Sequence, residues 1–201
     1  SAHKHEMNDR IVFNLYSENA ENVAQSLDAL NQMGYPLNHN SFIRIMILDI
    51  YSYAGSSNSV LFDIAIRENI LESLHTSRMD GPVCALITFN RHKQFVVLLF
   101  CNDDTLGSLS NLSFSSFYQN LTEKIDPAIA CYVGQCSTFP FIREEVFYIH
   151  NHILNNVSKK SGLFFVEKEK ASEEHLSIDE NISRWKYLLD ARQFSSLETS
   201  I

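Results

Sequence analysis

The chain has 201 residues, 45% of them hydrophobic, and a formal net charge of −8. A chain of this length buries about 70% of the surface that its unfolded form exposes, so it can build a core without a metal or a disulfide. Its acidic balance argues against direct nucleic-acid binding, because phosphate contacts need clustered Lys and Arg. No apolar run approaches about 20 residues. We therefore expect no membrane contact by this segment and a cytoplasmic location.

The cysteines predict a reduced interior and no metal chemistry. Cys84, Cys101 and Cys131 lie inside apolar runs, and none of the four cysteines forms a CxxC pair with Cys136 or with another. Packed thiols are the usual outcome of this pattern, and we expect no cofactor. The chain begins "SAHKHEM" and ends "SSLETSI" where a helix would start, so we expect a piece excised from a longer protein.

The first third of the chain predicts helix, strand and helix. Residues 9–33 are expected to form one helix that ends at Gly34, because Val23, Leu27 and Leu30 recur at helical spacing. Residues 41–53 are apolar and β-branched, which favours a central strand. Residues 60–74 predict a largely buried helix. Its expected apolar face holds Val60, Ile64, Leu71 and Leu74, with Phe62, Ile66 and Ile70 beside them.

A β-hairpin is predicted next. Two apolar strands at 83–89 and 94–101 flank the polar tip "NRHK" at 90–93. The following elements are a short helix, a strand, a longer helix and a last strand. They are placed around Phe114, Phe117 and Leu121, and at 127–136, 141–157 and 162–166.

The C-terminal part predicts a charged linker and a connector helix. Residues 167–175 read "EKEKASEEH", which is charged and poor in apolar residues. Ser177 and Glu180 form a capping box in front of an amphipathic stretch. This helix is expected to dock back on the domain, to pack on a second copy or to connect to the next domain. Its apolar residues are Ile178, Ile182, Trp185 and Leu188.

This order predicts three parts and an α+β fold. Residues 1–40 are a helical lead-in, 41–166 an α+β domain, and 167–201 the linker and connector helix. Within 41–166 the order is strand, helix, strand, strand, helix, strand, helix, strand. That order favours a ferredoxin-like, mainly antiparallel sheet with helices packed on it, and with helical extensions at both ends.

Three stretches carry a resemblance to a known family. They are "LNQMGYPLNHNSFIRIMILDI", "FDIAIRENILESL" and "EEVFYIHNHILNNVSKKSGLFFVEKE". In this order they resemble a degenerate GGDEF-type nucleotide cyclase fold. More closely, they resemble the cyclase-like regulatory region that precedes the DNA-binding domain of bacterial AraC-type and PucR-type transcription regulators. The resemblance covers roughly residues 15 to 170, and it is one of order and texture.

The resemblance implies that the cyclase chemistry has been lost. An active cyclase of this type needs a carboxylate on its first strand and further acidic residues at the hairpin, which together hold two divalent cations. Asp49 stands where the first-strand carboxylate would be. Asn90, Arg91, His92 and Lys93 stand where the Gly-Gly-Asp/Glu-Glu-Phe signature would be. One carboxylate beside Arg and Lys cannot hold two Mg²⁺ ions well, so we expect no enzyme.

The resemblance also implies a function. We expect a regulatory, signal-transmitting domain upstream of a helix-turn-helix output domain that this chain lacks. Its partners would be a second copy, in a possible homodimer, and its own output domain, with DNA contacted only through that domain. The alternative is a small-molecule or nucleotide sensor whose relic cleft uses Asp49, Arg91, His92 and Lys93. The simplest interpretation is a solvated hairpin tip and a strand-end Asp49 that pairs with backbone, Lys or Arg.

Overall fold

The computed structural model describes residues 10–16, 19–51, 59–79, 84–89, 94–102, 109–125 and 128–167. By its internal contacts the chain divides into two units, Ser1–Glu167 and Lys168–Ile201. All described residues belong to the first unit. The hairpin tip at 90–93, the predicted linker beyond Glu167 and the connector helix with Ile182, Trp185 and Leu188 lie outside the described residues.

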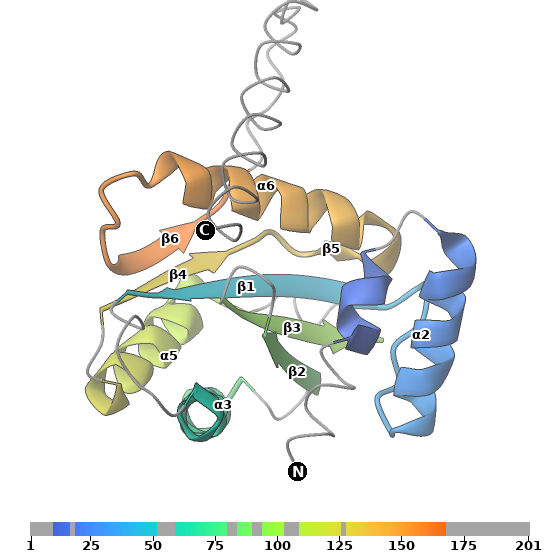
Figure 1. The fold of residues 1–201 in the computed structure, drawn as a ribbon, viewed down its shortest axis with the longest axis horizontal. Coiled ribbons are helices and arrows are strands. Elements are labelled where there is room, and N and C mark those ends of the chain that lie inside the picture. The colour runs from blue at the N-terminus through green and yellow to red at the C-terminus, as the bar shows by residue number, and fades with distance from the viewer. Residues whose placement is uncertain are drawn as a thin grey trace, which may run out of the picture. The chain divides into compact units, whose positions relative to one another are not determined.

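The strands form one six-stranded sheet in which the first strand of the chain is central (Figure 1). The order is β2-β3-β1-β4-β6, and β1 is antiparallel to both β3 and β4. β4 and β6 run parallel, and the short β5 pairs with the first residues of β1. The strands are β1 (Phe42–Ile50), β2 (Cys84–Phe89), β3 (Phe95–Cys101), β4 (Ile129–Val133), β5 (Ser137–Thr138) and β6 (Gly162–Phe165).

The topology has a ferredoxin-like part and an added unit. The sequence of elements β1, α3, β2, β3, α5, β4 produces the strand order β2-β3-β1-β4, which is the ferredoxin-like arrangement. Helix α6 then crosses over and returns the chain as β6, parallel to β4, as a helical crossover requires. The predicted α+β class, with a mainly antiparallel sheet and helices packed on it, is confirmed.

Helices cover both faces of the sheet. α3 (Ser59–Thr76) and α5 (Asn111–Lys124) pack on one face, while α2 (Ala20–Gln32), residues 10–15 and α6 (Ile142–Asn155) contribute to the core on the other. Figure 1 shows α6 above the sheet and α3 and α5 below it. Since both faces are buried, the central strands are apolar almost throughout. Alternate residues of β1 enter the two cores, namely Met46, Leu48 and Ile50 on the α3–α5 side and Ile43, Ile45 and Ile47 on the α6 side.

The single helix predicted over 9–33 is wrong. Residues 10–15 form a first helical segment and Tyr16 lies in a turn. α2 then starts afresh behind the N-cap Asn19, whose side chain accepts a hydrogen bond from the Glu21 backbone N–H at 2.9 Å. An Asn side chain competes with helical backbone for such bonds, which makes it a strong helix start. The predicted end is confirmed, because Gly34 adopts the left-handed φ of 88°.

The strand predicted over 127–136 is too long. β4 ends at Val133, and the next residue, Gly134, donates its N–H to the Ile45 carbonyl at 2.8 Å. A Cβ at Gly134 would lie 3.3 Å from that same carbonyl oxygen, so glycine allows the close approach. The chain can therefore bend and form β5, which the sequence did not predict.

The apolar face predicted for α3 needs one correction. Leu71 is 51% exposed, whereas Ile66, Ile70 and Leu74 are buried in the core. These three residues recur every fourth position, and Phe62 extends the same row, which packs on the core. Leu74 was predicted on the apolar face, whereas Phe62, Ile66 and Ile70 were predicted to lie beside it. For α6 the predicted face is confirmed, with Ile142 and Ile149 buried and Val146 and Ile153 packed against that core.

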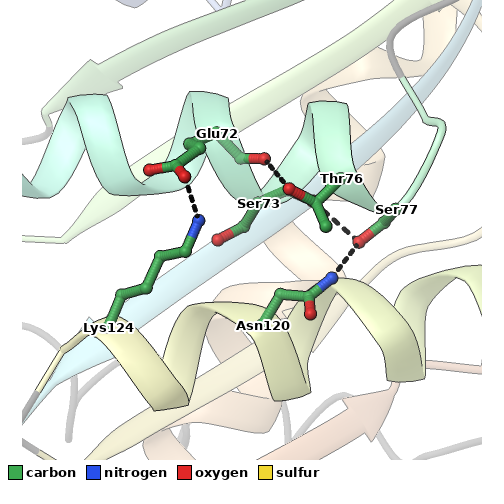
Figure 2. Close-up of polar contacts among 6 residues, drawn as sticks. All are labelled: Glu72, Ser73, Thr76, Ser77, Asn120 and Lys124. Carbon is green, nitrogen blue, oxygen red and sulfur yellow. Dashed lines mark hydrogen bonds and ion pairs between the residues drawn. The ribbon is translucent and has the colours of Figure 1, made fainter.

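α3 and α5 are also joined by polar contacts (Figure 2). Lys124 Nζ lies 2.9 Å from Glu72 Oε1, and Asn120 Nδ2 donates to Ser77 Oγ at 3.1 Å. The ion pair is exposed enough that its contribution is small. Between these contacts Ser73 is fully buried, and its Oγ has no hydrogen-bond partner among the residues described.

Ser73→Ala is therefore expected to raise the free energy of unfolding by about 1 kcal/mol. The substitution removes a desolvated hydroxyl and places the best helix former in α3. Urea denaturation measures the change. Ser116→Ala, at an exposed position of α5, is the control that carries only the helix-propensity gain. A gain for Ser73→Ala no larger than that of Ser116→Ala would show that the hydroxyl is satisfied.

Candidate functional site

Asp49 lies at the end of β1, on the face covered by α6. It is opposite Ala130 of β4. Because Leu48 pairs with Phe95, the first residue of β3, the preceding residue Gln94 lies beside Asp49 on the other side of β1. Gln94 is buried, and its side chain hydrogen-bonds the Asp49 carboxylate. Gln94, at the base of the hairpin, therefore hydrogen-bonds Asp49, the carboxylate that the sequence predicted as a site residue.

The charge that faces Asp49 comes from the turn between α6 and β6. Lys159 attracts the carboxylate electrostatically. It sits in a left-handed conformation, with φ of 47°, and its backbone N–H donates to the Asn156 carbonyl at 2.9 Å. Burial nevertheless raises the pKa of Asp49, and Lys159 and the Gln94 hydrogen bond only partly oppose that effect. The carboxylate is thus held in a partly desolvated place.

Asn156 joins this region into one network. It is the C-cap of α6, and its Nδ2 lies 2.7 Å from Tyr132 Oη, 3.1 Å from Tyr51 Oη and 3.0 Å from the Lys160 carbonyl oxygen. Its Oδ1 accepts the Lys160 N–H at 3.1 Å. The Tyr132 ring stacks on Phe164 of β6, with centroids 5.1 Å apart. One side chain therefore links the end of β1, the middle of β4 and the α6–β6 turn.

The hydroxyl of Tyr51 remains protonated in this setting. Burial raises its pKa, as do its hydrogen bond with Tyr132 and the negative charge of Asp49, while the hydrogen bond with Asn156 lowers it. Tyr51 is therefore a neutral hydrogen-bonding group beside the carboxylate. We call the whole set the Asp49 cluster; its members are Asp49, Tyr51, Gln94, Tyr132, Asn156 and Lys159.

The sequence found only part of this cluster. Asp49 was predicted, whereas Arg91, His92 and Lys93, the other candidates, lie outside the described residues. The remaining five members were missed. Two signals could have found some of them: the period of two in a strand puts Tyr51 on the same face as Asp49, and an Asn at a helix end often caps it.

The donor set of the cluster does not suit a pair of Mg²⁺ ions. Such ions bind carboxylate and carbonyl oxygens, and two of them need several carboxylates. Asp49 instead accepts a hydrogen bond from the Gln94 amide and interacts electrostatically with Lys159 and Tyr51. Within the described residues no three His, Cys, Asp or Glu side chains gather as a metal site would require. The arrangement instead tethers a strand end to the α6–β6 turn.

Asp49→Asn is expected to stabilise the protein at neutral pH. The folded state raises the pKa of Asp49, so the ionised carboxylate favours the unfolded chain and stability falls as pH rises from about 3.9, the unfolded value, through the folded value. The amide removes that penalty. The gain should appear in urea unfolding at pH 7 and vanish below about pH 4.

Glu68→Gln is the matched control, since Glu68 is an exposed carboxylate of α3. We expect it to shift the unfolding midpoint little at either pH. If Asp49→Asn destabilised the protein at pH 7 and not at low pH, the attraction of Lys159 would outweigh burial, and the assigned balance would be wrong.

Two arginines, the partly buried Arg44 and the buried Arg67, have structural roles. Arg44 lies 4.3 Å over the Phe114 ring, and its Nε donates to the Gly134 carbonyl at 3.0 Å. Arg67 donates to the Ile87 carbonyl at 2.6 Å. Burial lowers the pKa of Arg44, an effect that Cys136 partly opposes. Both guanidinium groups donate hydrogen bonds to backbone carbonyls, so we do not assign either to a ligand.

Comparison with known proteins does not identify this chain. No protein-family model matches it, and no curated protein matches it either. None of the described helices has the combined length and apolarity that crossing a bilayer requires. The fold and the Asp49 cluster are therefore the features from which a function is inferred.

Proposed function

We propose that this chain is a non-catalytic regulatory module of an AraC-type transcription regulator, which passes a signal to a helix-turn-helix output domain further along the parent chain. The observation that carries the proposal is the environment of Asp49. The resemblance assigns this position to a metal-binding carboxylate, yet here the Gln94 amide hydrogen-bonds it and the positive charge of Lys159 attracts it. With Asp49 in these surroundings, the domain serves packing and signalling rather than phosphoryl chemistry.

The network also suggests how a signal would travel. The Asp49 cluster joins the base of the hairpin, the end of β1 and the α6–β6 turn, and β6 is the last strand before the chain passes Glu167. A ligand or partner that broke the Asn156 hydrogen bonds would release this turn. Two arrangements of one turn make a two-state element that an input can bias.

The net charge of the chain supports a module that does not itself bind DNA. With a net charge of −8, the module leaves DNA contacts to the output domain. The module would work in the cytoplasm, where a bacterial regulator meets its DNA.

The alternative is a sensor for a small molecule or nucleotide at the same cluster. A partly desolvated carboxylate beside amide and phenol groups could accept hydrogen bonds from a ligand base. A thermal-shift panel of nucleotides tests this function. A ligand present at a hundredfold over its Kd would add about 2.7 kcal/mol of stability, whereas no shift with any nucleotide would count against the sensor.

The regulatory proposal is tested with the full-length parent protein and a reporter gene under its promoter. We expect the coding sequence to continue into two helix-turn-helix units, and deletion of residues 1–167 to abolish the signal response while DNA binding persists. Asp49→Asn should leave the basal reporter level intact. A parent chain without a DNA-binding domain, or a cyclic nucleotide product formed from GTP or ATP, would overturn the proposal.

A further inference from the structure

We draw no further inference here: the strongest candidate, the exposed apolar patch that Phe147, Leu154 and Val157 form on α6 and just beyond its end, carries nothing because nothing among the described residues shows what covers it.

Discussion

Asn156→Ala is expected to lower the free energy of unfolding by about 2–3 kcal/mol. Tyr132 is 2% exposed, and its hydroxyl would lose the donor that now lies 2.7 Å away. The α6–β6 turn would lose both side-chain bonds to Lys160, and α6 would lose its C-cap. Several hydrogen bonds of one side chain are lost together, so the effect should exceed that of an average hydrogen bond. Urea unfolding, followed by circular dichroism, measures it.

Asn155→Ala is the control for Asn156→Ala. It makes the same substitution one residue earlier, at an exposed position inside α6. We expect a change within about 0.5 kcal/mol, as is usual for surface substitutions. If the two variants were equally stable, Asn156 would not link the strands to the turn, and the mechanical part of the proposed function would lose its support.

Phe114→Ala is expected to have the largest effect, a loss of about 3–5 kcal/mol. The Phe114 side chain is fully buried on α5, where its ring meets Phe165 of β6 edge-on, with centroids 6.1 Å apart. The same ring supports the Arg44 guanidinium. Truncation therefore opens a cavity and also leaves the partly buried Arg44 cation without its aromatic contact. The measurement is again the free energy of unfolding in urea.

Phe114→Leu keeps the comparison useful if the alanine variant does not fold. Leucine fills most of the space but offers no ring to Arg44, so we expect a smaller loss, about 1–2 kcal/mol. Leu112→Ala, two residues earlier and 77% exposed, should change stability by less than about 0.5 kcal/mol. A Phe114→Ala variant as stable as Leu112→Ala would mean that α5 does not pack as described.

The secondary structure could largely be predicted, because local patterns specify it. β1 and β3 are apolar enough to identify as strands, and the polar tip between β2 and β3 indicated a hairpin. The features that were missed depend on single residues or distant partners. The break before α2 rests on Asn19, and β5 has two residues that leave no pattern; it exists because Ile43 pairs with Ser137.

The candidate site was less predictable than the fold. Asp49 is conspicuous as a lone carboxylate in an apolar strand, so the sequence could find it. Gln94, Tyr132 and Asn156 come from three other elements, and only the sheet register and the position of α6 bring them to Asp49 or to each other.

The central place of β1 has a consequence for how the protein is made. β1 is the first strand to leave the ribosome, yet its partners β3 and β4 are synthesised only after α3 and after α5. Until then, nine residues of nearly continuous apolar strand have both edges open. An open apolar strand is the kind of segment that pairs with other chains. The nascent chain should therefore depend on a chaperone, and a pause in translation between β1 and β3 should lower the soluble yield.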